Sequence, residues 1–295
     1  MRLVVTGREG QVVRSLMERA ADTAVEVVSV GRPELDLAGD AAAIGAAIEC
    51  ARPDAIVSAA AYTQVDRAET DQHAAFAINA EGARAVAEAA ARLSVPLIHL
   101  STDYVFDGTS PSPYRETDDT GPTGVYGKSK LAGEQAVLEA HANSVILRTA
   151  WVYSPFGANF VKTMLRLAGE RDEISVVADQ RGNPTSALDI ADGILKVASN
   201  LHASPSEELR GIFHMTGQGS ATWADFAETI FDFSAALGGP NAAVRPIGSA
   251  DYPTPARRPQ NSKLDSSKLE QIHGVTLPMW QASTKEVVQR LVNKR

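Results

Sequence analysis

The chain has 295 residues and 44% of them are hydrophobic, which is enough for one large α/β domain or two lobes and argues against disorder. The net charge of -8 argues against nucleic acid or an anionic membrane as a partner, because neither offers a countercharge to an acidic surface. Cys50 is the only cysteine, which excludes an intrachain disulfide and a Cys-based zinc cluster.

The first half of the chain alternates short β-branched runs with alanine-rich amphipathic stretches. We expect strands at residues 3–5, 25–30, 55–58, 97–100 and 144–148. Between them the apolar spacing predicts helices at residues 11–20, 41–50, 70–93 and 125–141. This alternation is typical of a doubly wound α/β fold, in which a parallel sheet carries helices on both faces.

Beyond residue 151 the pattern is less regular. We expect short strands at residues 174–178 and 212–216, and helices at residues 160–168, 188–199, 223–237 and 283–293. The proline-rich stretch at residues 245–262 has no clear period and is interpreted as a binding loop. We therefore predict a dinucleotide-binding (Rossmann) lobe at residues 1–150, to which segments near 184–216 return, and a smaller, partly interleaved substrate lobe formed mainly by residues 151–295.

The first residues form a predicted strand that runs directly into a glycine-containing turn. They do not look like a signal peptide, and no apolar run is long enough to span a bilayer, so we expect a cytoplasmic protein. Gly7 and Gly10 lie between this strand and the next helix, where backbone N–H groups at a helix start can bind a pyrophosphate. Val13 stands where a third glycine is usual, and the alternative for this glycine pair is an ordinary tight turn.

Arg32 follows the second predicted strand, at a position where an NAD-preferring site commonly carries an acidic residue. An arginine there can pair with a 2'-phosphate, so we expect NADPH, with NADH also accepted; the alternative is a solvated arginine that begins a loop. Asp36 and Leu37 are expected to border the adenine, and the small Ala59 and Ala60 to let the backbone approach the cofactor.

Tyr126 and Lys130 stand four residues apart in a predicted helix, which places a phenol and an ammonium on one face. We expect the lysine to lower the pKa of the phenol and to bond the nicotinamide ribose. Thr102 ends the fourth strand, at the edge of the sheet where ligands of such folds bind, and can hold a carbonyl oxygen. The alternatives are an exposed helix face for the pair and a strand-end cap for Thr102.

These motifs, in this order, make the chain similar to the extended short-chain dehydrogenase/reductases. The resemblance includes Thr6-Gly-Arg-Glu-Gly10, Ser101-Thr-Asp-Tyr-Val-Phe106 and the odd proline-rich stretch at residues 252–262, and it covers nearly the whole chain. Within that family, the chain most resembles the branch that reduces dTDP-linked 4-keto sugars.

The resemblance implies a role for each of three groups of residues. The catalytic triad consists of Thr102, Tyr126 and Lys130. The cofactor site contains Gly7, Gly10, Gln11, Arg32, Ala59, Ala60, Lys130 and Thr149. The sugar-nucleotide site contains Thr63, Val65, Trp151, Asn159, Lys162 and Arg258. For Trp151 the alternative is a core aromatic residue, and for Arg258 a surface charge.

The implied reaction is hydride transfer from NADPH to C4 of dTDP-4-dehydro-L-rhamnose, in which Tyr126 protonates the oxygen that Thr102 orients. Some similar enzymes bind magnesium through carboxylates at a subunit contact, but Ser15 stands where we would look for the acid, so we expect no metal. A homodimer is compatible with this assignment.

Two alternatives remain: an epimerase or dehydratase that recycles tightly held NAD, and a non-catalytic NADP-binding regulatory subunit. Asp103 lacks the adjacent glutamate of a 4,6-dehydratase, which favours the reductase.

Overall fold

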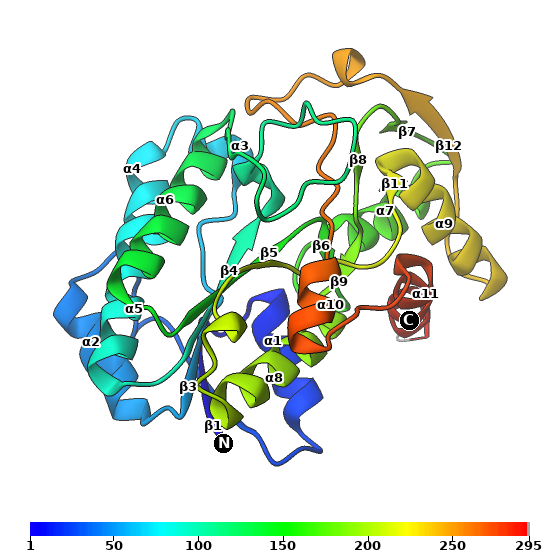
Figure 1. Cartoon of the computed structure of the whole chain (residues 1–295). Coiled ribbons are helices and arrows are strands. Elements are labelled where there is room, and N and C mark those ends of the chain that lie inside the picture. The colour runs from blue at the N-terminus through cyan, green and yellow to red at the C-terminus, as the bar shows by residue number, and fades with distance from the viewer. Residues whose placement is uncertain (294–295) are drawn as a thin grey trace.

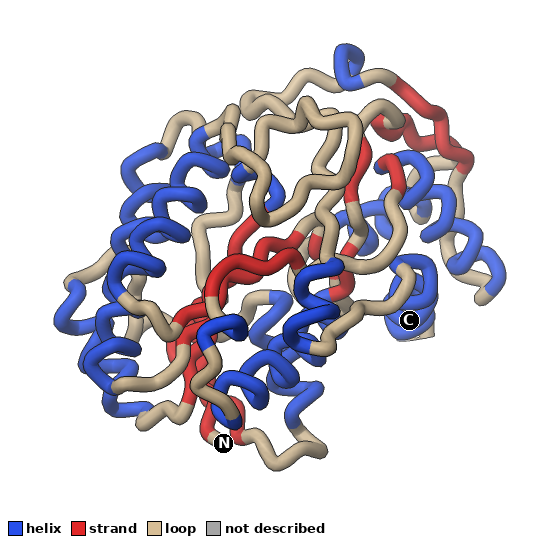
Figure 2. The backbone as a smooth tube through the Cα atoms, in the orientation of Figure 1, coloured by secondary structure: helices blue, strands red, loops and turns tan. Residues whose placement is uncertain are grey.

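A six-stranded parallel sheet forms the centre of the molecule in the computed structural model, which describes residues 1–293 (Figures 1 and 2). The order across the sheet is β10-β5-β4-β3-β1-β2, and each neighbouring pair is parallel. The strands are β1 (Arg2–Thr6), β2 (Glu26–Val30), β3 (Ala55–Ser58), β4 (Leu97–Thr102), β5 (Ser144–Thr149) and β10 (Gly211–His214). The order reverses between β1 and β3, which is the point where doubly wound folds bind their ligands.

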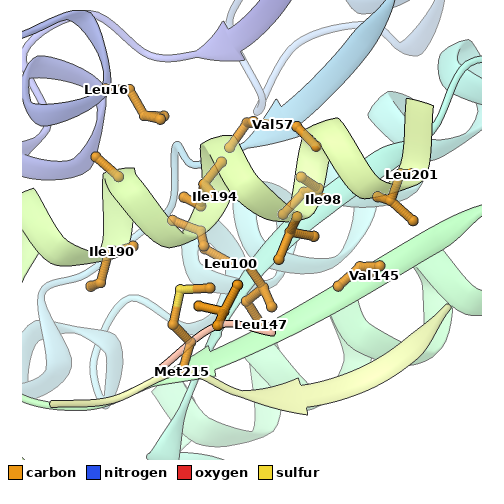
Figure 3. Close-up of a cluster of buried hydrophobic side chains, with 14 of the residues drawn as sticks. Leu16, Val57, Ile98, Leu100, Val145, Leu147, Ile190, Ile194, Leu201 and Met215 are labelled. Atoms are coloured by element: carbon orange, nitrogen blue, oxygen red, sulfur yellow. The ribbon is translucent and has the colours of Figure 1, made fainter. Parts of the chain in front are cut away.

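Helices cover both faces of this sheet, which confirms the predicted doubly wound fold (Figure 1). One face carries α1 (Gln11–Ala20) and α8 (Ala187–Ala203), and the other carries α2 (Ala41–Ala51), α5 (Gly82–Leu93) and α6 (Val125–Ala140). Because side chains alternate along a strand, Leu3 and Val5 of β1 belong to the first core and Val4 belongs to the second. Figure 3 shows the first of these cores, where Leu16 and Ile194 pack near Val57 and Ile98.

The predicted helix at residues 70–93 is not continuous. It consists of α4 (Gln72–Phe76), a π-helical turn (Ala77–Glu81) and α5. Asn79 lies in that turn and is buried; its Nδ2 donates to Ser129 Oγ on α6 at 2.9 Å, and its Oδ1 accepts from the Tyr62 N–H at 2.8 Å. The π-helical turn thus directs the Asn79 side chain toward the helix that carries Tyr126. Periodicity alone does not predict such a turn.

A second hydrophobic core lies beyond the sheet. It is built from α7 (Phe160–Ala168), α9 (Trp223–Ala236), α11 (Trp280–Val292) and a parallel pair of strands, β7 (Glu173–Val177) and β12 (Ala243–Ile247). The predicted loop at 245–262 is therefore wrong at its start, because residues 245–247 lie in β12 and pair with β7. Two small ladders complete this part: β6 (Val152–Tyr153) with β9 (Thr185–Ser186), and β8 (Arg181–Gly182) with β11 (Ala221–Thr222).

The chain passes more than once between the two cores. After β9 it forms α8 against α1 and then β10 at the edge of the main sheet, and later α10 (Ser267–His273) packs on β10. Leu269 of α10 and the following Val275 belong to the core of the main sheet. The segments that return to this sheet thus extend beyond residues 184–216. Within residues 1–293, no helix combines the length and apolar character needed to cross a membrane.

Candidate active site

A cavity of about 660 Å³ opens at the carboxyl ends of β1, β3, β4 and β5. Its walls therefore come from four strand ends and from α1 and α6. Twelve of the residues expected in the site line it: Gly7, Gly10, Gln11, Ala59, Ala60, Thr63, Val65, Thr102, Tyr126, Lys130, Thr149 and Trp151. The structure thus brings the glycine turn, the threonine and the Tyr-Lys pair to one place.

The glycine turn joins β1 to α1 at the edge of this cavity. Gly7 has φ 98°, a left-handed conformation that favours glycine, and its N–H donates to Val30 O at 2.7 Å. Gly10 precedes α1 and offers no side chain to cap it, so the N–H groups of the first turn stay available for an anion. Thr6 Oγ1 accepts the N–H groups of Ala59 and Ala60, both at 3.0 Å, which holds the ends of β1 and β3 together.

The residues predicted for the adenine end lie outside the lining of the cavity. Arg32 and Asp36 are exposed, and Leu37 is buried in the core beneath α2 and α5. The structure adds Arg8, which the sequence analysis missed although it stands between the two glycines. Its guanidinium bonds Gly31 O at 3.5 Å and pairs with Glu34 at 2.5 Å, so a second cation lies at the end of β2.

Helix α6 places Tyr126 and Lys130. Gly124 cannot cap it with a side chain, and instead Glu69 Oε1 accepts the N–H of Val125 at 2.9 Å. Gly127 lies against the carbonyl oxygen of Tyr104 so closely that a Cβ would collide with it. The helix therefore approaches the end of β4, where Thr102 and Tyr104 lie, more closely than a larger residue would allow.

The ionisation of the Tyr-Lys pair differs from the expectation. Burial raises the pKa of Tyr126 to about 12, the Asp103 charge adds to this, and a hydrogen bond with Thr102 opposes it. The expected lowering of the Tyr126 pKa by Lys130 is wrong, because the lysine Nζ donates instead to Leu100 O at 2.6 Å. Burial also lowers the pKa of Lys130 to about 8, against the opposing charge of Glu134.

His99 is a further neighbour of Lys130 that the sequence analysis missed. Its Nε2 lies 3.4 Å from Lys130 Nζ, and its Nδ1 lies 3.0 Å from Ser58 Oγ. Burial and the lysine charge hold the pKa of this imidazole well below its usual value, so the ring is neutral. A neutral ring that accepts from the ammonium at Nε2 carries its proton on Nδ1 and donates it to Ser58.

An ion pair lies beneath the site, one helical turn beyond Lys130. Arg148 NH2 of β5 lies 2.6 Å from Glu134 Oε2, and both side chains are 2% exposed. Ser101, the residue before Thr102, donates to the same carboxylate at 2.5 Å. Glu134 therefore ties α6 to both β4 and β5, directly beside the end of β4. Removal of one buried partner is expected to leave the other charge uncompensated.

Trp151 lines the cavity in an unusual conformation. Its φ is 47°, a region that costs a non-glycine residue about 1–3 kcal/mol unless the surroundings hold it there. Its ring stacks on Trp223 of α9 with centroids 3.6 Å apart and an interplanar angle of 4°, and Phe160 packs on Trp223 in turn. One indole face of Trp151 is therefore occupied by protein, and Trp223 is a supporting residue that the sequence analysis missed.

Three expected substrate residues lie outside the lining of this cavity. The side chain of Asn159 caps α7 and also donates to the side chain of Gln11 at 3.0 Å. Lys162 lines a neighbouring cavity of about 490 Å³. Arg258 pairs with Asp66 of α3 (Val65–Ala68) at 2.7 Å. The structure thus gives Asn159 a structural role and holds Arg258 through a carboxylate.

Within residues 1–293, no cluster of three or more His, Cys, Asp or Glu residues could hold a metal ion. Ser15 is buried and donates to Gln11 O at 2.8 Å. The expected absence of a metal stays a prediction.

Comparisons with known proteins identify the family. A family model described as the RmlD substrate binding domain matches residues 1–293. The chain belongs to this family. Among the curated relatives, a dTDP-4-dehydrorhamnose reductase of Sinorhizobium fredii (strain NBRC 101917 / NGR234) is 52% identical over 99% of this chain and 98% of its own length. The enzyme of the same name in Escherichia coli K12 is 40% identical over 99% of this chain and 98% of its own length.

Several solved structures superpose on the chain over nearly its whole length. A dTDP-4-dehydrorhamnose reductase of Clostridium acetobutylicum has a TM-score of 0.91 at 36% identity and covers 99% of both chains. The enzyme of Bacillus anthracis, solved in complex with NADP, has a TM-score of 0.89 at 35% identity, covering 100% of this chain and 99% of its own. A UDP-glucose 4-epimerase of Thermus thermophilus has a TM-score of 0.80 at 20% identity, covers 99% of each chain and shows the fold alone.

Proposed function

We propose that the chain is an NADPH-dependent reductase that converts dTDP-4-dehydro-L-rhamnose to dTDP-L-rhamnose. The single observation that carries the proposal is the cavity in which Thr102, Tyr126 and Lys130 meet the glycine turn at the reversal of the strand order. The choice of substrate rests on the names of the relatives, which match over nearly the full chain at 40–52% identity.

The residues at the cavity fit a dinucleotide. The free N–H groups at the start of α1 suit a pyrophosphate, and Arg8 suits a 2'-phosphate at the end of β2. Thr149 Oγ1 is buried and has no hydrogen-bond partner within residues 1–293, so it suits a polar group of the nicotinamide end. When bound, NADPH would supply the hydride. We expect NADH to be accepted as well, because the Glu34 carboxylate beside Arg8 would suit a free 2'-hydroxyl.

Tyr126 donates the proton that completes the alcohol. With a pKa of about 12, the phenol holds its proton at neutral pH. Thr102 interacts with the same hydroxyl and orients the substrate oxygen beside it. Lys130 is already buried at the cavity wall, where its ammonium can turn from Leu100 O toward a cofactor ribose. General acid catalysis by a positioned group of this kind contributes about 100- to 10,000-fold.

The sugar nucleotide occupies the side of the cavity formed by Thr63, Val65 and Trp151. The sugar packs on the part of the indole that Trp223 leaves open. Arg258 and Lys162 lie outside the lining of this cavity, and they are the cations that would pair with the diphosphate. A cytoplasmic location and a homodimer complete the proposal; size-exclusion chromatography with light scattering tests the latter.

The Tyr126→Phe substitution tests the proposal, and Lys128→Met, at an exposed position of the same helix, is the control. Oxidation of NADPH is followed with purified dTDP-4-dehydro-L-rhamnose and no other protein present. We expect Tyr126→Phe to lower kcat by about 100-fold or more, with unchanged NADPH affinity, and the control to match the wild type. Near-normal turnover by Tyr126→Phe would refute the assigned proton donor. Failure of the wild type to oxidise NADPH without a partner would instead favour the regulatory subunit.

A further inference from the structure

Asp103 is a buried carboxyl group beside the catalytic threonine. It is 3% exposed and lines the cavity, and its Oδ1 accepts the hydroxyl proton of Thr102 over 2.9 Å. The 3-10 turn Asp103–Val105 begins there, and Thr102 Oγ1 caps it by accepting the N–H of Tyr104 at 3.2 Å. Thr102 is therefore held from two sides before any substrate is present.

A hydroxyl group has one proton and two lone pairs. The proton of Thr102 is directed to Asp103, and the Tyr104 N–H occupies one lone pair. The hydrogen bond with Thr102 lowers the pKa of Tyr126, as a bond donated to the phenol oxygen does, so Asp103 and the phenol compete for the one proton of Thr102. While Asp103 accepts this proton, Thr102 has none to offer to a substrate oxygen.

We propose that Asp103 is a positioning residue that sets the direction of the Thr102 hydroxyl. As a carboxylate, Asp103 takes the threonine proton. As a carboxylic acid, it donates its own proton to Thr102 Oγ1, which frees the threonine proton for the substrate oxygen. The inference deepens the proposed reduction and rests on it. No net proton leaves Asp103 in the reaction, because Tyr126 supplies the one that the product gains.

The surroundings of Asp103 make both forms accessible. Burial raises the pKa of its carboxyl to about 6, and the nearby hydroxyl groups of Ser262 and Thr102 oppose the rise. The titratable neighbours are Tyr104 in the same turn and Tyr126 on α6, and the Asp103 charge raises the pKa of both phenols.

Two further charges act on the Tyr104 phenol: Arg258 lowers its pKa and Asp66 raises it. Because the acid form of Asp103 is the productive one, kcat/KM falls as pH rises through the pKa of Asp103.

A double-mutant cycle measured at two pH values tests the coupling. The variants are Thr102→Val, Asp103→Asn and their combination, and Asp119→Asn at an exposed site is the control. The ratio of wild-type to Thr102→Val kcat/KM is measured with the ketosugar at about pH 5 and about pH 8. We expect this ratio to be about tenfold larger at the lower pH, since only there does Thr102 donate to the substrate. In the Asp103→Asn background the same ratio is expected to be equal at both pH values.

If the ratio of wild-type to Thr102→Val kcat/KM does not change with pH, the inference is overturned. It is also overturned if kcat/KM of Asp103→Asn falls with rising pH as it does in the wild type. The first comparison does not require Asp103→Asn to fold. Thr102→Ser keeps the hydroxyl and is expected to show the wild-type dependence of kcat/KM on pH. A purely structural role of Thr102 would not link this pH dependence to the hydroxyl. If the wild type does not oxidise NADPH with the ketosugar at any pH, the proposed reaction itself fails, which is a separate result.

Discussion

Glu69 Oε1 accepts the backbone N–H of Val125 over 2.9 Å, and this contact begins helix α6. Gly124 has no side chain to cap the helix, so a carboxylate from 56 residues upstream takes that role. A negative charge is also favourable at a helix N-terminus, because of the helix dipole. Tyr126 is the next residue after Val125, so the position of its hydroxyl depends on how well this first turn is held.

We predict that Glu69→Ala lowers the free energy of unfolding by about 1 kcal/mol, the typical cost of a lost helix cap. It should also lower kcat while the affinity for NADPH stays close to the wild-type value, since α1 is untouched. Glu69→Gln keeps an acceptor oxygen at the same place and should retain most of both properties. Urea unfolding and steady-state kinetics measure the two effects, and an unchanged kcat in Glu69→Ala would show that Tyr126 does not depend on the cap.

The cap illustrates how far the sequence predicts the site. The Tyr126–Lys130 spacing and the end of β4 are local signals, and the structure places both at one cavity. Glu69 could not be assigned, because its partner is distant in the chain and is a backbone N–H group that leaves no pattern. The same holds for Asn79, whose π-helical turn interrupts a helix that periodicity predicts as continuous. Long-range hydrogen bonds, and not propensities, decide these positions.

At the adenine end, the sequence favours Arg32 as the partner of a 2'-phosphate, and the structure offers Arg8 as well. Arg8 is held at Gly31 O and paired with Glu34, so we predict that it is the more important of the two. Arg8→Ala should raise the KM for NADPH about tenfold and leave the KM for NADH nearly unchanged, because NADH lacks the phosphate. If Arg32→Ala changes the ratio of the KM values for NADPH and NADH more than Arg8→Ala does, Arg32 is the more important of the two arginines.

The stacking of Trp151 on Trp223 predicts that loss of Trp223 affects both the KM for the sugar nucleotide and the stability, whereas loss of another core tryptophan affects the stability alone. Trp223→Leu removes the ring that supports Trp151, so we expect a loss of about 3 kcal/mol in unfolding free energy and a KM for the sugar nucleotide that rises several-fold. Trp280→Leu is the control: Trp280 is 4% exposed in the same core but does not line the cavity. It should destabilise the protein by a similar amount with an unchanged KM. If both variants raise the KM equally, general loosening of the lobe accounts for the effect.

The buried ammonium of Lys130 predicts the sign of a pH effect on stability. Its pKa is about 8 in the folded protein and about 10.5 when unfolded, so between these values the unfolded chain binds more protons and stability rises with pH. The full effect approaches about 3 kcal/mol. Urea unfolding of the cofactor-free protein at pH 8, 9 and 10, run beside Lys130→Met, isolates this contribution, because every other titrating group is common to the two proteins.

Lys128→Met, at an exposed position of the same helix, should follow the wild type. Equal slopes in wild type and Lys130→Met would mean that the lysine reaches water in the cofactor-free protein. The bond to Leu100 O would then not hold the Lys130 side chain in the wall of the cavity. The ammonium would have to move from solvent toward a ribose, and not from Leu100 O as proposed.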